Sequence, residues 1–225
     1  MKTKLFVGIA IFSTAISFAQ EQTETAKFGF LTFNLTSAVV SYAPRWDVGY
    51  FHILNDNFTV GAEIGYGNAD LAGINIFGSE LKSDYELFEL RPELIYTISR
   101  IGRTKRFVSA EFYYLRHTDA FTTSRYFENG IDFFYDSADY KRTKYGFNLN
   151  YGVIINFTKN FGMIPKFGFG PRFRNVSYSN VVGKVERPND DDENHNYLDT
   201  DGYIKNAGRQ LDLNLVFDIK LFFRL

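Results

Sequence analysis

"RQLDLNLVFDIKLFFRL", residues 209–225, alternates apolar and polar side chains almost without a break. Every second residue from Leu211 to Leu225 is apolar, and the positions between them include Asp212 and Asp218. A β-strand repeats every two residues, so the segment predicts a strand with one apolar face and one charged face. The same alternation recurs in seven further segments, at 27–37, 45–54, 58–67, 87–98, 107–117, 144–157 and 162–175.

The composition excludes several classes of protein. The 225 residues carry a formal net charge of −1 and include no cysteine. Without a basic excess we expect no nucleic-acid partner, and without cysteine a disulfide framework, a thiolate metal site and a cysteine nucleophile are excluded.

The first 19 residues have the pattern of an export signal. Two lysines precede an apolar stretch at 5–16, and Ser17-Phe18-Ala19 offers small residues at the −3 and −1 positions of a cleavage site. We therefore expect residues 1–19 to be a cleaved signal peptide and residues 20–225 to form one exported domain.

The connections between the expected strands alternate in length. Short ones lie at 55–57, 99–105 and 158–160, and long ones lie at 37–44, 67–83, 118–140 and 178–206. Short turns on one side and long loops on the other are typical of an outer-membrane barrel. The fold class predicted is therefore all-β, an eight-stranded antiparallel up-and-down transmembrane β-barrel with both termini in the periplasm.

The two faces of the strands differ in bulk, which indicates the face that points inward. The apolar face is rich in Phe, Tyr and Leu, whereas the other face mixes glycine with charges. Eight strands leave just enough interior for side chains, so the glycine-rich face is expected inside and the aromatic face in lipid. The alternative is a soluble, lipocalin-like periplasmic barrel with its apolar face inward.

The turns predict the register. A three-residue turn at 55–57 pairs Tyr50 with Ala62, and a similar turn at 158–160 pairs Tyr151 with Phe167. Asn129-Gly130 predicts a type I′ hairpin joining strands of about 20 residues.

Breaks in the alternation predict irregularities. The pattern slips near Phe30-Leu31, where we expect a bulge. Pro92, Pro165 and Pro171 lie within strands and cannot donate to a neighbouring strand, so bulges are expected there too.

Three segments carry a resemblance to a known family. "FELRPELIYTI", "FGPRFRN" and the terminal "DIKLFFRL" resemble the small outer-membrane β-barrel proteins of the OmpX/OmpA transmembrane type, particularly those of Bacteroidetes-like bacteria. The resemblance implies the outer membrane of a Gram-negative bacterium, contact with outer-membrane lipid and lipopolysaccharide, and insertion by the barrel-assembly machinery, which reads the last strand. One departure is Leu225, where such chains usually end in Phe.

The inward face predicts a closed, salt-bridged lumen. Seven acidic and seven basic residues fall on it: Arg45, Asp47, Glu63, Glu89, Arg91, Glu93, Glu111, Lys144, Lys166, Arg172, Arg174, Asp212, Asp218 and Lys220. Lone buried ions are costly, so these charges are expected to pair, with Glu89, Arg91 and Glu93 facing Arg172 and Arg174 at the centre. A small channel is the alternative.

Catalytic and metal sites are weakly indicated. Some eight-stranded outer-membrane barrels modify lipid, and His117 has Asp119 and Ser124 close in sequence, but nothing fixes a triad geometry. We predict no catalytic residue and no cofactor. Asp199 and Asp201 match only the tail of a calcium-loop motif, so no metal ion is predicted, and an external cation site at this pair is the alternative.

The long hairpin around 129–130 predicts a surface for interaction. It would project beyond the membrane with six apolar residues on its sides: Tyr126, Phe127, Ile131, Phe133, Phe134 and Tyr135. These side chains could bind an extracellular protein partner or rest on lipopolysaccharide. The alternative is that they pack on the neighbouring loops, 67–83 and 178–206.

Overall fold

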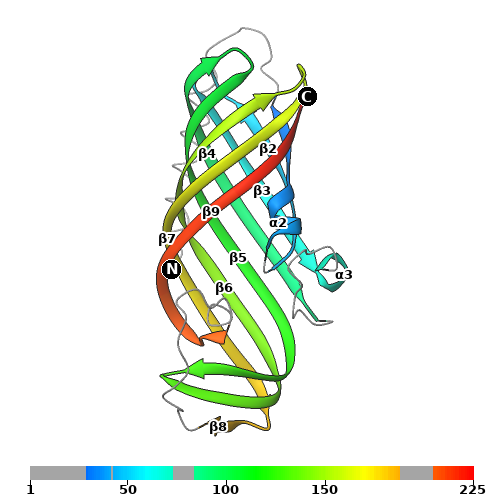
Figure 1. Ribbon diagram of the computed structural model, residues 1–225, viewed down its shortest axis with the longest axis vertical. Coiled ribbons are helices and arrows are strands. Elements are labelled where there is room, and N and C mark those ends of the chain that lie inside the picture. Colours follow the sequence, from blue (N-terminus) through cyan, green and yellow to red (C-terminus); the bar gives the residue numbers. More distant parts are fainter. Residues whose placement is uncertain (1–28, 42, 73–83, 188–204) are drawn as a thin grey trace, which may run out of the picture.

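The computed structural model describes residues 29–41, 43–72, 84–187 and 205–225 (Figure 1). The predicted signal peptide and the pair Asp199 and Asp201 lie outside the described residues. Among the described residues, no helix has both the length and the apolarity needed to cross a membrane.

Antiparallel strands make up nearly all of the described chain. The elements are β1 (Phe30–Asn34), α2 (Leu35–Val39), β2 (Trp46–Ile53), β3 (Phe58–Asn68), α3 (Ala69–Ala72), β4 (Glu86–Ile101), β5 (Thr104–Glu128), β6 (Ile131–Asn156), β7 (Phe161–Val182), β8 (Val185–Arg187) and β9 (Gly208–Arg224). Strands β1 to β7 and β9 form a ring, closed by pairing of β1 with β9, while the short β8 pairs only with β6. The predicted eight-stranded up-and-down barrel is confirmed.

The register follows the predicted turns. Tyr50 lies opposite Ala62, and Tyr151 lies opposite Phe167. Glu128 lies opposite Ile131, so the hairpin turns at Asn129-Gly130 as expected. Strands β5 and β6 are 25 and 26 residues long, longer than the predicted 20.

The predicted bulges were wrong. Phe30 and Leu31 of β1 pair in a continuous register with both neighbouring strands. The register is also the same on both sides of Pro92, Pro165 and Pro171, where only a few residue pairs with one neighbouring strand are missing. A one-residue slip would move every later side chain from lipid to lumen, so losing a hydrogen bond at each proline is the smaller cost.

An apolar belt surrounds the ring. On β7 it includes the exposed Phe167 and Phe169, whereas Asn175, further along the same outward face, is polar. On β5 the belt runs outward from Val108 to Tyr114 and ends at the exposed Arg116. The buried face carries the charges, so the soluble alternative with an apolar interior does not fit the structure.

Two clusters of buried apolar residues close the ends of the barrel. At the short-turn end (the turns at 54–57, 102–103 and 157–160) the cluster comprises Phe30, Phe51, Ile95, Phe107, Ile154, Ile164 and Phe222. Glycines make room for its rings, because a Cβ at Gly152 would overlap the ring of Phe107. At the opposite, hairpin end a second cluster, the aromatic cap, comprises Phe121, Tyr126, Tyr135, Ala138, Tyr140 and Val176.

The extension of β5 and β6 bends across the hairpin end of the ring (Figure 1). Thr123 and Asn180 adopt positive φ values of 50° and 51°, and the β6–β7 register shifts between Ser137 and Asp139. Phe127 bridges Asn206, and its carbonyl accepts from Ala207 N at 2.7 Å, just before β9 begins. Since β6 and β7 separate β5 from β9 in the wall, the hairpin must reach over the mouth.

Charge placed on the belt tests its orientation. We expect Phe167→Arg to lower the free energy of unfolding in lipid vesicles by about 2–4 kcal/mol, because the guanidinium would lie in hydrocarbon. Asn175→Arg, outward on the same strand but beyond the belt, should cost about 1 kcal/mol or less. Equal effects in urea titrations of the two variants would contradict this placement of the membrane.

Candidate functional site

The centre of the lumen is a cluster of paired charges. Arg91 Nη2 on β4 lies 2.7 Å from Asp218 Oδ2 and 3.0 Å from Glu111 Oε2. Lys166 Nζ on β7 lies 2.6 Å from Glu111 Oε2 and 3.0 Å from Glu93 Oε2. All five residues are buried, so four strands of the ring are joined by ion pairs in a low-dielectric interior.

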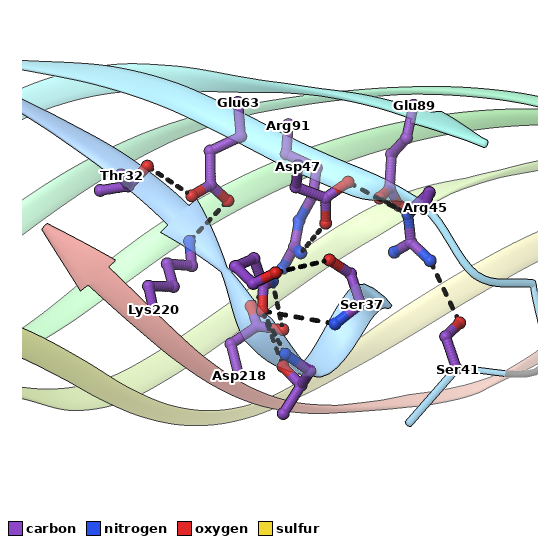
Figure 2. Close-up of polar contacts among 12 residues, drawn as sticks. Thr32, Ser37, Ser41, Arg45, Asp47, Glu63, Glu89, Arg91, Asp218 and Lys220 are labelled. Carbon is purple, nitrogen blue, oxygen red and sulfur yellow. Dashed lines mark hydrogen bonds and ion pairs between the residues drawn. The ribbon is translucent and has the colours of Figure 1, made fainter. Parts of the chain in front are cut away.

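The cluster extends to the two strands that close the ring (Figure 2). Lys220 Nζ on β9 lies 2.6 Å from Glu63 Oε2, whose Oε1 accepts from Thr32 Oγ1 on β1 at 2.8 Å. Asn34, at the end of β1, donates from Nδ2 to Asp218 Oδ1 at 3.1 Å. Ring closure and charge pairing therefore use the same side chains.

A second group of charges lies nearer the hairpin end. Arg45 Nε lies 2.5 Å from Glu89 Oε2 and 3.3 Å from Asp47 Oδ1, and Figure 2 shows its guanidinium between these carboxylates and Ser41. Asp47 also faces Arg91 Nη1 at 3.9 Å, which links this group to the central cluster.

The structure places all fourteen predicted lumen charges on the inward face and Arg91 and Glu93 in the central cluster, but the expected pairing with Arg172 and Arg174 was wrong. Arg172 Nη2 and Arg174 Nη2 lie 3.0 and 4.0 Å from Asp212 Oδ2 on the adjacent β9, not against the acidic residues of β4. Lys166 on the same strand does reach Glu93 of β4, whereas Arg172 lies directly opposite Asp212 in the β7–β9 register and pairs with it there. Lys144 lies over the ring of Tyr113, with Nζ 5.1 Å from its centroid.

Neutral side chains complete the cluster and were missed in the sequence. Asn148 Nδ2 donates to Glu111 Oε1 at 2.8 Å, and Asn214 Nδ2 donates to Asn148 Oδ1 at 3.0 Å. Ser109 Oγ donates to Glu93 Oε1 at 2.5 Å. These residues fall on the inward face in the sequence alternation. A prediction based only on charged residues therefore missed the neutral members of the hydrogen-bond network.

His117 lies just beyond the belt, on the inward face of β5. Its ring packs edge-on against Tyr85 and Tyr140, with centroids 5.0 and 5.1 Å away. Burial, with nearby Arg142 as a second cause, lowers the pKa of His117 well below its ordinary value. Its Nε2 lies 4.0 Å from Asp119 Oδ2, and among the described residues neither ring nitrogen has a hydrogen-bond partner, so no triad with Ser124 is formed.

The six apolar residues of the predicted hairpin surface differ in exposure. Tyr126 and Tyr135 are buried in the aromatic cap, where Tyr126 stacks on Tyr178 at 4.4 Å between centroids. Burial raises the pKa of the Tyr178 hydroxyl well above its ordinary value. Of the six, only Phe134 is exposed, while Phe127, Ile131 and Phe133 are half-buried.

Comparisons with solved structures find matches at low sequence identity. One match is CarO of Acinetobacter baumannii, with 13% identity, a TM-score of 0.41, and coverage of 91% of this chain and 100% of that one. Another is a major outer membrane protein of Thermus thermophilus, with 11% identity, a TM-score of 0.43, and coverage of 90% and 100%. No protein-family model and no curated protein matches the chain. Likeness at this level says nothing about what the chain binds or does.

Removal of one central cation tests the coupling of the lumen charges. We expect Arg91→Met to lower the free energy of unfolding by about 3–5 kcal/mol, because Asp218 and Glu111 would stay buried with less compensation. Arg172→Met is the matched control: its partner Asp212 is partly exposed, so the loss should be about 1 kcal/mol or less. Urea unfolding in vesicles measures both, and a cost for Arg172→Met as large as that for Arg91→Met would refute the central role of Arg91.

Proposed function

We propose that this chain is a closed, non-conducting barrel of a Gram-negative outer membrane, with its short turns in the periplasm and its capped hairpin at the cell surface. Its role there is structural and interactive: it presents a fixed extracellular surface to a protein partner. The observation that carries the proposal is the β5–β6 extension, which crosses the mouth of the ring and is held there by the aromatic cap.

A closed lumen is supported at three levels. Phenylalanine rings fill the short-turn end, paired charges join opposite strands in the middle, and the aromatic cap covers the hairpin end. The seven acidic and seven basic lumen residues balance, whereas selective pores present rings of one sign to the passing ion.

Two exposed apolar residues beside a sheet edge support the proposal of a partner-binding surface. Phe134 on β6 and Val185 on β8 lie opposite each other and are 41% and 63% exposed. Strand β8 ends the order of the sheet, so within the described part of the chain its outer edge carries no further strand. An exposed strand edge with flanking apolar side chains suits the addition of an extended segment from another protein.

Conductance tests the closed lumen. Reconstituted in planar bilayers, the full-length mature chain should give no discrete current steps, while an open general porin in the same bilayers serves as positive control. Regular single-channel steps from this chain would refute a closed lumen and favour the small-channel alternative.

Site-specific cross-linking tests the surface. A photoreactive residue at Phe134 or Val185, on intact cells of the native host, should give the same discrete adduct. The same group at Ser179, which is exposed on β7, is the matched control and should give none. Absence of an adduct at both apolar positions, or one adduct shared by all three, would contradict the proposed surface.

A further inference from the structure

Of the three short turns, the one that joins β4 to β5 is the most basic. Residues 99–106 read SRIGRTKR, and they carry four cationic side chains and no acidic one. Arg100 lies directly opposite Lys105, and Ser99 lies opposite Arg106, across a turn in which Gly102 has a positive φ of 57°. Like charges opposite each other on paired strands repel, so this β4–β5 hairpin carries an electrostatic cost.

The three arginines of the β4–β5 hairpin, Arg100, Arg103 and Arg106, are not neutralised within the described part of the chain. Their side chains form no ion pair there. The described residues of the short-turn end include two negative groups, Asp56 and the carboxyl terminus of Leu225. Three further cations belong to the same end and can offset both: Lys105, Lys159 and Arg224. The charge of the three arginines therefore needs a counter-charge from outside the described chain.

Arg106 lies at the edge of the apolar belt. On the outward face of β5 it comes just before Val108, where the belt begins, and Arg116 comes just after Tyr114, where the belt ends. At about 3.3 Å per residue and a tilt of about 40°, the strand rises roughly 25 Å between the two arginines, which is the height of the apolar band of such barrels. Arg106 and Arg116 therefore lie at the levels of the two headgroup layers.

The two arginines at the edges of the belt have different neighbours. Glu86 is exposed on β4, diagonal to Arg116 on the outward face, so a carboxylate lies close to that guanidinium. Arg106 instead has Ser99 of β4 and Val153 of β6 opposite it, and neither carries a charge. A lipid phosphate at this level would supply the negative charge that Arg106 lacks.

We propose that the β4–β5 hairpin binds the headgroup of an anionic phospholipid in the leaflet on the short-turn side. The phosphate accepts hydrogen bonds from the Arg106 guanidinium and from the Ser99 hydroxyl opposite it, while Arg100 and Arg103 add positive charge from the tip of the hairpin. The planar guanidinium offers several donors to one phosphate, which makes arginine the favoured residue for this contact.

The apolar surroundings favour a lipid over a soluble anion. Ile98 and Ile101 of the β4–β5 hairpin are exposed, and so is Val108 of the belt, so acyl chains can lie against the barrel directly beside the arginines. Binding is non-covalent. It does not depend on the partner surface proposed above, because Phe134 and Val185 lie at the opposite end of the ring.

A fluorescent reporter tests the lipid preference at the β4–β5 hairpin. Trp46 is the only tryptophan, so Trp46→Phe/Val108→Trp moves the fluorophore to the belt beside Arg106. The full mature chain is refolded into phosphatidylcholine vesicles that contain either phosphatidylglycerol or phosphatidylcholine with brominated acyl chains, which quench a nearby tryptophan. We expect a preference of about tenfold for phosphatidylglycerol at residue 108. Equal quenching by the two brominated lipids would overturn the proposal.

Matched variants in this reporter chain locate the site. Arg106→Gln should lower the preference about fivefold. Arg116→Gln makes the same charge change on the same face of β5, at the other edge of the belt, and should leave the preference unchanged. Gel mobility before and after heating verifies that each variant folds. An equal loss in the two variants would show that net charge, and not the β4–β5 hairpin, attracts the lipid.

A competition arm distinguishes a lipid headgroup from a soluble anion. Inorganic phosphate should lower the quenching by brominated phosphatidylglycerol no more than sodium chloride does at the same ionic strength, because the acyl chains contribute to binding. Displacement of the lipid by phosphate alone would overturn the proposal and would assign the arginines to a soluble anion.

Discussion

Five residue pairs between β1 and β9 close the ring, and the rest of the structure depends on them. In hydrocarbon, each unpaired backbone group costs several kcal/mol, so an antiparallel sheet is stable in a membrane only when its first and last strands meet. Here that junction is reinforced from inside, because Thr32 and Asn34 of β1 bond to Glu63 and Asp218. The backbone pairing that closes the ring is therefore coupled to the ion pairs inside it.

That constraint determines how the interior is filled. A ring of eight strands has little room, so phenylalanines at the short-turn end face glycines, and longer charged side chains occupy the middle, where they can reach partners on other strands. Burying ions is expensive, and an apolar filling could be more stable. Arg91 and Lys166, however, each pair with several carboxylates, and this disfavours a slipped register. A shift of one residue in any strand would turn its charged side chains toward lipid.

The sequence predicted which face of each strand points inward. It did not predict which side chains meet across the ring. Alternation identified the eight strands, the bulk of the two faces identified the lipid-facing side, and the turn at 55–57 gave the pairing of Tyr50 with Ala62. It could not show that Arg91 meets Asp218, since those residues lie 127 positions apart and come together only through ring closure. The bend of the hairpin was equally hidden, because it includes a positive φ at Thr123, and a β-branched residue seldom adopts that conformation.

The early end of β1, which pairs with β9 only from Lys220 to Arg224, has a local cause in the sequence that follows it. Asn34 Oδ1 accepts from the backbone N–H groups of Thr36 and Ser37, an N-cap that turns the chain from strand to helix. The same side chain donates to Asp218, so the cap is anchored to the central charges. Had the strand continued, β1 would have covered β9 toward Gly208 and sealed the ring. A single asparagine therefore takes part in the closure of the barrel and also ends the strand that closes it.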